Sequence, residues 1–528
     1  MMKKVIKKLL AALLAVAMVC AMAIPAFADD TKENIQDHNS FSGFQIFKGD
    51  VEGNKISNVQ WGINITNPTE FLDKLKADAT LGKLFNEAAD VQDVLAVIGT
   101  WHDSDDNSIA FARFVCKYLY PDANAKPKPF VESNHSLTFP QAGYYLIVDT
   151  TYFNPGDSYH AYNSFMLKVT QANWVFDVTP KVEKPSVKKE VYDNNDIGST
   201  GENNGWGSSA DHAINEEFQF QLIATLPASP DRAYDYYDEY AVLFNDTLSN
   251  GITYDRLDSV VIESKGTPYD ITNSSKYNVD LSYLKSNNYF AVVIPDVKAC
   301  GEGLNLNNGA TITVTYTAHL NENAYVNTGN GQTENKNEVQ LQYSNNPKNS
   351  SYRGVTPKDE VCVYTYQLNN TKRAEKEDGT PLPGAVFQLY SDKDCTQEVK
   401  LYKVGNIYFP IKDATDKAKD AVQMISGQDG QFNVKGLDAG TYYLKEITPP
   451  SGYSACANKE IVISATHNGN HVELDSSKLS TTIINKKDGG ITLPSTGGIG
   501  TTLFYVVGGG LMVAAIVLLV TKKRMENK

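Results

Sequence analysis

The sequence has few cysteines, few histidines and less positive than negative charge. Its 528 residues include 6 Cys and 8 His, with 48 basic against 62 acidic side chains and a net charge of −14 at pH 7. Outside the N-terminal segment the cysteines are widely spaced: Cys116, Cys300, Cys362, Cys395 and Cys456. This spacing argues against a disulfide framework, and no CxxC pair or histidine cluster has metal-ligand spacing. We therefore expect no metal site, no cofactor and no nucleic-acid partner.

Catalytic motifs are missing as well. The chain has no GxSxG, no HExxH and no credible pair of catalytic carboxylates. We therefore do not expect an enzyme. The chain is instead rich in tyrosine (30), glycine (37) and proline (21), a composition typical of a soluble, β-rich extracellular protein.

The C-terminal end carries three adjacent signals. Residues 493–497 read Leu-Pro-Ser-Thr-Gly, residues 503–520 are almost entirely apolar, and a Lys-Lys-Arg tail follows. About 20 apolar residues are enough to span a bilayer of about 30 Å as a helix, and the basic tail would stay in the cytoplasm. This order resembles the cell-wall sorting signal of Gram-positive surface proteins, in which a sortase cleaves after the threonine. The resemblance implies a transmembrane sorting helix preceded by this motif: Leu493, Pro494, Ser495, Thr496 and Gly497.

The N-terminal end has the layout of a secretory signal peptide. Four lysines precede an apolar segment at 9–24, and Ala-Phe-Ala at 26–28 precedes two aspartates. We expect cleavage after residue 28. The mature chain would then be secreted and anchored to the cell wall as residues 29–496, a length that predicts three domains.

Strand-like alternation predominates in the mature chain, so we expect a mainly β protein of tandem immunoglobulin-like β-sandwich domains. Residues 70–120 have helical spacing instead. The first domain should therefore carry a helical insertion, with Thr69 as the N-cap of its first helix. The expected boundaries are as follows: 1–28 signal peptide, 29–181 N-terminal domain, 182–355 middle domain, 356–488 C-terminal domain, and 489–528 sorting signal, transmembrane segment and basic tail.

Polar residues recur on the predicted inner faces of strands. Because side chains alternate along a strand, Lys189, Asp246 and Asn337 of the middle domain each share a face with apolar neighbours two residues away. The last domain repeats this order with three further residues: Lys372, Glu446 and Asn485. Polar groups on core-facing positions are costly unless they pair. We therefore predict two buried clusters, each of a lysine, an acid and an asparagine.

Such a cluster can form an intramolecular isopeptide bond. Burial lowers the pKa of a lysine and raises the pKa of a carboxyl group, each by up to about 3 to 5 units. The neutral amine can then attack the asparagine amide while the acid stabilises the developing oxyanion, and ammonia leaves. Well-oriented groups reach effective molarities of about 10⁵ to 10⁸ M. From the spacing alone, an unreacted cluster of hydrogen bonds is the more conservative interpretation.

Two segments of the last domain resemble a known family. Residues 379–389 (GTPLPGAVFQL) and 440–453 (GTYYLKEITPPSGY) are similar to the collagen-adhesin B-type (Cna-B-type) domain of pilin shafts. The second segment resembles the family's E-box, whose glutamate promotes the isopeptide bond. The resemblance assigns that role to Glu446, with Lys372 as the amine and Asn485 as the amide. Asn370 stands where the family has an apolar residue, so Lys376 is the alternative amine.

The middle domain resembles that of the major (backbone) pilins of Gram-positive sortase-assembled pili of the SpaA type. The family's acid corresponds to Asp246 in the segment FNDTL at 244–248. The resemblance implies Lys189 and Asn337 as its partners, and Lys188 is the competing lysine. By its place in the alternation, however, Lys188 would face outward with Glu190.

A further segment, VTPK at 178–181, is similar to the pilin motif. The lysine of that motif is joined to the sorting threonine of the next subunit, which implies a linkage between Lys181 and Thr496. A threonine replaces the usual tyrosine of the motif here. Lys184 is therefore an alternative to Lys181, and an ordinary linker lysine is the other interpretation.

The first domain resembles its family counterpart mainly at Trp61-Gly62 and at 143–149 (GYYLIVD). When the two Tyr-Tyr-Leu segments are aligned, Val148 takes the place of Glu446, so we expect no isopeptide bond there. In the last domain, Cys395 and Cys456 could form a disulfide in an extracellular setting, and free thiols are equally consistent.

Together these features predict the shaft subunit of a covalently polymerised pilus. A sortase would form an acyl intermediate at Thr496, the amine of Lys181 from another copy would resolve it, and the last subunit would pass to peptidoglycan. The expected partners are other copies of the chain, pilus-class and housekeeping sortases, peptidoglycan, minor pilins, and host surface ligands in adhesion. The alternative is a monomeric wall-anchored adhesin that binds a host or matrix ligand, and a wall-anchored hydrolase is less favoured.

Overall fold

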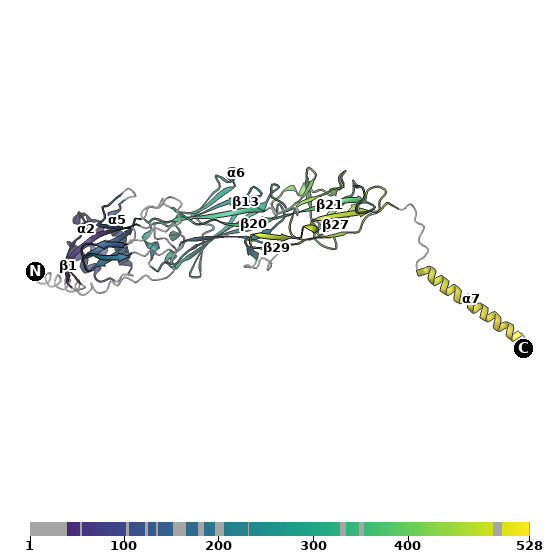
Figure 1. Ribbon diagram of the computed structural model, residues 1–528, viewed down its shortest axis with the longest axis horizontal. Coiled ribbons are helices and arrows are strands. Elements are labelled where there is room, and N and C mark those ends of the chain that lie inside the picture. Colours follow the sequence, from purple (N-terminus) through teal and green to yellow (C-terminus); the bar gives the residue numbers. More distant parts are fainter. Residues whose placement is uncertain are drawn as a thin grey trace.

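The chain is elongated, and its β-rich parts follow one another along the long axis in sequence order (Figure 1). This computed structural model describes residues 40–52, 55–101, 105–121, 125–133, 136–150, 165–177, 184–195, 205–230, 232–327, 334–347, 353–488 and 499–526. The predicted signal peptide and the sorting motif lie outside these ranges. We use the names N-terminal, middle and C-terminal domain for the three β-rich parts.

The N-terminal domain is built on one main sheet with the strand order β2-β1-β5-β6, and β3 also pairs with β1. Strands β4 and β7 form a separate antiparallel pair. In β5 every residue is buried, because the insertion covers one face of the sheet and the β4–β7 pair covers the other. The strands are β1 (Phe41–Glu52), β2 (Lys55–Trp61), β3 (Val131–Ser133), β4 (Ser136–Phe139), β5 (Gly143–Asp149), β6 (Phe165–Val169) and β7 (Trp174–Asp177).

The predicted helical insertion is present between β2 and β3. Its helices are α2 (Pro68–Ala77), α3 (Gly82–Phe85), α4 (Val91–Ile98) and α5 (Asp106–Leu119). The N-cap prediction was wrong: Asn67 caps α2 by accepting a hydrogen bond from the Glu70 amide at 3.2 Å. Pro68 occupies the first turn, where its missing N–H is not needed. Thr69 therefore lies inside the helix.

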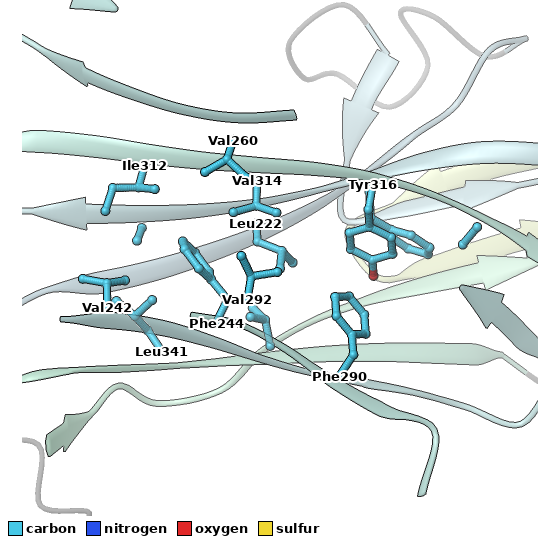
Figure 2. Close-up of a cluster of buried hydrophobic side chains, with 14 of the residues drawn as sticks. Leu222, Val242, Phe244, Val260, Phe290, Val292, Ile312, Val314, Tyr316 and Leu341 are labelled. Carbon is cyan, nitrogen blue, oxygen red and sulfur yellow. The ribbon is translucent and has the colours of Figure 1, made fainter. Parts of the chain in front are cut away.

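The middle domain is a β-sandwich, and its hydrophobic core is the largest in the described part of the chain. One sheet has the order β14-β13-β17-β11-β8-β9, and the facing sheet has the order β10-β20-β18-β12-β16-β15, with β19 paired to β18. Inward side chains of both sheets, among them Leu222, Phe244 and Leu341, meet between the layers (Figure 2). The strict alternation of buried positions along β11 shows why the sequence pattern predicted strands here.

The strands of the middle domain range from 2 residues in β9 to 13 residues in β13. In chain order they are β8 (Ser186–Tyr192), β9 (Trp206–Gly207), β10 (Ser209–Asp211), β11 (Glu217–Leu226), β12 (Val242–Leu248), β13 (Ile252–Ser264), β14 (Thr267–Asp270), β15 (Asn278–Asp280), β16 (Tyr289–Ile294), β17 (Ala310–Leu320), β18 (Asn335–Ser344), β19 (Arg353–Val355) and β20 (Asp359–Tyr364). Short helical turns lie between them: η2 (Ala233–Tyr236), α6 (Leu284–Asn287), η3 (Val297–Ala299) and η4 (Leu306–Asn308). Although β20 follows the boundary expected at 355, it pairs with β18 and belongs to the middle sandwich.

The C-terminal domain is a second sandwich. Its sheets have the orders β23-β24-β26-β21-β31 and β25-β22-β27-β28, and β29 pairs with β30. The strands are β21 (Tyr366–Ala374), β22 (Val386–Tyr390), β23 (Leu401–Val404), β24 (Ile407–Pro410), β25 (Met424–Ile425), β26 (Val434–Leu437), β27 (Gly440–Thr448), β28 (Lys459–Ile463), β29 (Ala465–Asn468), β30 (His471–Leu474) and β31 (Ser480–Asn485), with turns η5 (Lys417–Asp420) and η6 (Ser476–Leu479). The first and last strands, β21 and β31, lie side by side and run parallel.

The C-terminal helix α7 (Ile499–Glu526) contains the apolar segment predicted at 503–520. The helix is thus present where the sequence predicted one (Figure 1). Within the described residues, no helix combines the length and the apolarity that crossing a membrane requires.

Packed contacts join the three domains. Tyr236 of the middle domain packs into the core of the N-terminal domain, and Lys117 of α5 pairs with Asp238 at 2.7 Å. At the other end, Tyr402 and Phe409 of the C-terminal domain extend the core of the middle domain. The described structure is therefore mainly β, with helices confined to the N-terminal insertion, short turns and α7, which confirms the predicted fold class.

Candidate functional site

The predicted polar set of the middle domain meets inside the sandwich. Lys189 projects from β8 in one sheet, whereas Asp246 on β12 and Asn337 on β18 project from the facing sheet. Strands β12 and β18 are neighbours, with Asp246 opposite Val339 and Asn337 opposite Leu248. The alternation of the sequence thus placed all three side chains correctly on inner faces.

Hydrogen bonds connect these three side chains, in part through a fourth residue, Tyr316. The Lys189 amine donates a hydrogen bond to Asp246, and both side chains are fully buried. The hydroxyl of Tyr316 on β17 lies between the groups: it accepts from Lys189 Nζ at 3.2 Å and from Asn337 Nδ2 at 2.6 Å, and it donates to Asp246 Oδ1 at 3.3 Å. Figure 2 shows Tyr316 among the apolar side chains of this core.

Burial controls the electrostatics of this set. It lowers the pKa of Lys189, although the nearby carboxylate of Asp246 offsets part of the effect. It raises the pKa of Asp246, and the Lys189 ammonium works in the opposite direction. Both shifts favour the neutral amine and the neutral acid, the forms that acyl transfer to the amine requires.

Tyr316 was not among the residues predicted from the sequence. A signal was available, because Tyr316 lies on the same inner face as residues 312 and 314, and a buried tyrosine hydroxyl needs a polar partner. The alternative lysine, Lys188, faces away from the core and pairs with Glu190 at 2.7 Å. Lys189 is therefore the amine next to the acid.

The corresponding set of the C-terminal domain is more compact. The Lys372 amine on β21 donates to Asn485 Oδ1 on β31 and lies 3.3 Å from Glu446 Oε1 on β27. Asn485 Nδ2 donates to the same Glu446 oxygen at 2.8 Å. The lysine therefore touches its amide directly, whereas in the middle domain the Tyr316 hydroxyl bridges the lysine and the amide.

Strand pairing explains this geometry. Parallel neighbours β21 and β31 place Ala374 opposite Asn485, so Lys372, two residues from Ala374, projects from the same face. Burial lowers the pKa of Lys372, and the Phe387 ring lies 5.3 Å from its ammonium nitrogen. The amine is thus desolvated beside the carbonyl that it would attack.

Lys376, the alternative amine, and Asn370 each make contacts of their own outside the Lys372, Glu446 and Asn485 set. Lys376 is 69% exposed and pairs with Asp378 at 3.2 Å, so it does not approach Glu446. Asn370 is buried and donates from Nδ2 to the Phe432 carbonyl at 3.1 Å. It therefore satisfies a backbone group at the position where the family has an apolar residue.

The remaining predicted residues fall into three groups. Lys181, Leu493, Pro494, Ser495, Thr496 and Gly497 lie outside the described residues. Lys184 is half-buried directly before β8. In the N-terminal domain, Val148 is buried in β5.

The disulfide considered for Cys395 and Cys456 is not formed, and both are free thiols. Cys456 instead lies beside the isopeptide set: its backbone N–H donates to Glu446 Oε2 at 2.8 Å, and its sulfur is 3.9 Å from the Lys372 amine. Burial raises the pKa of the Cys456 thiol to about 11. The thiol therefore stays protonated and is a poor competitor for the amide carbon.

A polar cluster that the sequence did not reveal lies at the junction of the middle and C-terminal domains. Two groups of residues there have potential metal-ligand atoms within 4.8 Å of one another: Asp193, Asp211 and His467, and His212, Glu216 and Asp438. No metal site was predicted from the sequence, because no CxxC pair or histidine cluster has metal-ligand spacing. Within these two groups, only His212 and Glu216 are close in sequence.

Contact between the acids of this cluster shifts the pKa values of Asp438 and Asp211 in opposite directions. Burial and the neighbouring acids Asp211, Glu216 and Asp193 raise the pKa of Asp438 well above its usual range. Burial also raises the pKa of Asp211, but hydrogen bonds from Asp438, His467 and Tyr366 outweigh it and lower this pKa to about 2. Asp438 is therefore the member that keeps a proton.

We expect Asp438→Asn to stabilise the chain progressively as pH rises. A carboxyl group whose folded pKa is raised contributes stability below its unfolded pKa. It loses that contribution as pH rises through the folded value, by about 1.4 kcal/mol for each pH unit that separates the two pKa values. The amide has no such dependence. Melting temperatures of both proteins in chelator should converge near pH 4 and separate by pH 8, with the variant higher, whereas a constant difference would contradict the assigned protonation.

Two family models match the sequence, both toward its C-terminal end. Residues 368–478 match the SpaA prealbumin-like fold domain, and residues 485–527 match the LPXTG cell wall anchor motif. These matches confirm the predicted pilin-type domain and sorting signal, so the chain carries a cell wall anchor. Neither match is to an enzyme. None of the curated proteins matches the chain in sequence.

Solved structures of major pilins resemble the chain at low sequence identity. The T6 backbone pilin of Streptococcus pyogenes serotype M6 has a TM-score of 0.48 and 17% identity, over 87% of this chain and 100% of that protein. The full-length major pilin SpaD of Corynebacterium diphtheriae has a TM-score of 0.42 and 21% identity, over 66% and 80%. The C-terminal fragment of the major pilin GBS80 of Streptococcus agalactiae has a TM-score of 0.41 and 20% identity, over 57% and 100%. These values are too low to transfer a function to the chain.

Proposed function

We propose that this chain is the shaft subunit of a covalently polymerised surface pilus, and that each of its last two domains is closed by a Lys–Asn isopeptide bond. One observation carries the proposal. Two consecutive domains of a chain with a cell wall anchor motif each bury a lysine, an acid and an asparagine together. A buried ion pair by itself contributes little net stability. Two buried ion pairs, each beside an asparagine, are therefore better explained by isopeptide bond formation than by a contribution to stability alone.

The chemistry follows from the contacts in the C-terminal domain. A proton passes from the Lys372 ammonium to Glu446, and the amine attacks Cγ of Asn485, which lies against it. Glu446 Oε1 contacts Nδ2 of this amide, so a half turn of the amide would bring its oxygen to the neutral acid, which would then donate to it and stabilise the oxyanion. As the Cγ–Nδ2 bond breaks, a proton from the attacking nitrogen passes to Nδ2, so one ammonia leaves and one amide bond remains.

In the middle domain, the same sequence of steps requires the Asn337 amide to turn. Its Nδ2 donates to Tyr316, while its Oδ1 has no hydrogen-bond partner among the described atoms. A half turn of the amide exchanges these two atoms and brings the oxygen toward the hydroxyl that Asp246 contacts. Tyr316 would then relay the acid's hydrogen bond to the oxyanion.

The two bonds would carry tension differently. In the C-terminal domain the bond would join β21 to β31, the strands by which the chain enters and leaves the sandwich. In the middle domain it would join β8 to β18 across the two sheets, and β20 rather than β18 is the last strand. Force along the shaft would bypass the strands between each pair of linked residues.

We further propose that the subunits are joined head to tail by a sortase, through Thr496 of one copy and Lys181 of the next, with Lys184 as the alternative lysine. The anchor match supports sortase processing, and the acceptor lysine follows from the pilin-like segment at 178–181. The partners in this proposal are other copies of the chain, the sortases and peptidoglycan, with host surface ligands for adhesion.

We expect Lys181→Ala to abolish polymerisation in the native host. Cell-wall extracts boiled in detergent should give a ladder of multiples for the wild-type chain and a single band for the variant, because the acyl intermediate would lack its acceptor amine. Lys188→Ala, which removes an exposed lysine of β8 outside the buried set, is the control and should keep the ladder.

The comparison with Lys184→Ala identifies the acceptor. Loss of the ladder in Lys184→Ala but not in Lys181→Ala would move the linkage to Lys184. A single band for the wild-type chain would instead favour the monomeric adhesin and overturn the shaft proposal.

A further inference from the structure

His212, Glu216 and Asp438 meet where the middle and C-terminal domains pack together. His212 and Glu216 belong to the segment between β10 and β11, and Asp438 lies in the turn between β26 and β27. One ligand atom from each residue lies within 4.8 Å of the others. The group therefore draws on both domains.

One nitrogen of His212 is buried without a hydrogen-bond partner. Nε2 must carry the ring proton, because it lies 2.7 Å from the Tyr192 carbonyl oxygen, which can only accept. Nδ1 therefore presents a lone pair, and no described atom donates to it although the side chain is fully buried. A buried acceptor left without a partner costs about 1 to 3 kcal/mol.

The imidazole is also held in a fixed plane. It stacks on the Phe218 ring at a centroid distance of 4.1 Å and an interplanar angle of 4°. An imidazole with one N–H bound to a carbonyl and the other nitrogen without a partner has the arrangement that protein metal sites use to orient a ligand.

Negative charge gathers around the same point. Asp438 faces Asp211, Glu216 and Asp193, and Asn195 Nδ2 donates to its Oδ2 at 2.7 Å. The Lys412 amine lies 3.6 Å from Glu216 Oε2 and is partly exposed. Glu216 and Asp438 therefore offer carboxylate oxygens within 4.8 Å of one another and of a His212 ring nitrogen.

In the neighbouring group, both ring nitrogens of His467 have polar partners. His467 Nδ1 lies 2.8 Å from the Ser209 hydroxyl, which donates in turn to the Gly469 carbonyl at 2.7 Å. Its Nε2 lies 3.2 Å from Asp211 and 3.5 Å from Asp193. Because both of these ring nitrogens have partners, His212 is the histidine of this junction with a nitrogen available to a ligand.

We propose that His212 Nδ1, Glu216 and Asp438 bind one divalent transition-metal ion of the Zn²⁺ class, which ties the middle domain to the C-terminal domain. One imidazole and two carboxylates are a ligand set for such ions, whereas Ca²⁺ and Mg²⁺ prefer oxygen alone. Ligand bonds of about 2.0 to 2.2 Å separate tetrahedral ligand atoms by roughly 3.3 Å, so the ligand atoms, now within 4.8 Å of one another, would draw together on binding.

Metal content of the purified mature chain tests the proposal. After stripping with EDTA and dialysis against Zn²⁺, residues 29–496 should hold about one tightly bound ion per chain and melt at a higher temperature than the stripped protein. His212→Phe keeps a ring against Phe218 but removes Nδ1, and Asp438→Asn keeps the shape of the side chain but cannot bind the ion as a carboxylate. Each should weaken zinc binding at least about tenfold.

Two further variants control for other histidines. His471→Ala removes an exposed side chain on β30 and should retain the ion. His467→Gln should retain it too, because the proposed ion lies at the neighbouring group. A wild-type chain that holds no tightly bound zinc would overturn the proposal, even if a variant fails to fold. Zinc binding that persists in Asp438→Asn, or that is lost only in His467→Gln, would do so as well. None of these outcomes depends on polymerisation.

Discussion

Glu446→Gln is expected to leave the C-terminal domain without its isopeptide bond and to lower its melting temperature by more than about 10 °C. The amide side chain keeps the size of the acid but cannot accept the proton of Lys372 or donate an acid's hydrogen bond to the oxyanion. A cross-link between residues 113 positions apart is worth about 5 kcal/mol by loop entropy. The unreacted Lys372 ammonium would also lose its carboxylate partner, at a cost of about 3 to 5 kcal/mol.

Intact mass and thermal unfolding measure this effect on the mature chain. Compared with the mass calculated from its own sequence, the wild-type chain should be lighter by two ammonia molecules and Glu446→Gln by one. Lys376→Ala is the matched control, because it removes the exposed alternative lysine and should match the wild type in both measurements. A control that also failed to lose the second ammonia would transfer the amine role to Lys376.

Asp246→Asn is expected to produce the equivalent loss in the middle domain. Lys189 and Asp246 are both completely buried, so removing the acid leaves an amine in the core with the Tyr316 hydroxyl as a neutral partner. Breaking a buried pair in this way costs about 3 to 5 kcal/mol, beyond the loss of the cross-link. We expect the melting temperature to fall by about 10 °C, since a larger domain shifts less for each kcal/mol.

The mass of Asp246→Asn should also show one ammonia loss rather than two, and Asp246→Asn combined with Glu446→Gln should show none. Lys188→Ala is the control, since Lys188 is adjacent in sequence but faces Glu190. Two ammonia losses in Asp246→Asn would mean that Asp246 is not the acid of the middle domain.

Strand periodicity was sufficient to predict the members of both polar sets. Each predicted lysine, acid and asparagine lies on a core-facing position, because a period of two fixes the face once the strand is recognised. Which strands are neighbours is not encoded in that period. The direct contact of Lys372 with Asn485, against the indirect contact of Lys189 with Asn337, therefore emerged only from the structure.

Residues that act through long-range packing were harder to predict. Tyr316 lies on a strand that the sequence pattern identified, but its hydroxyl contacts Asp246 and Asn337, which belong to the opposite sheet. The junction group combines His212 with Asp438, which are remote in sequence and come from different domains. Strand β20 likewise pairs with β18, although its sequence lies beyond the expected domain boundary.

Local capping chemistry was predicted less well than burial. Thr69 is a reasonable N-cap by residue type, yet Asn67 fills this position because Pro68 favours the first turn of α2. The error moved the helix start without changing the buried face, since Phe71, Leu72 and Leu75 still point into the core.

Mass spectrometry of tryptic peptides from native surface fibres is the most direct test of covalent cross-linking within and between subunits. We predict three branched peptides: one joining Lys189 to Asn337, one joining Lys372 to Asn485, and one joining Lys181 or Lys184 to the carboxyl group of Thr496 from another copy. Fibres that yield only linear peptides across these positions would contradict the account.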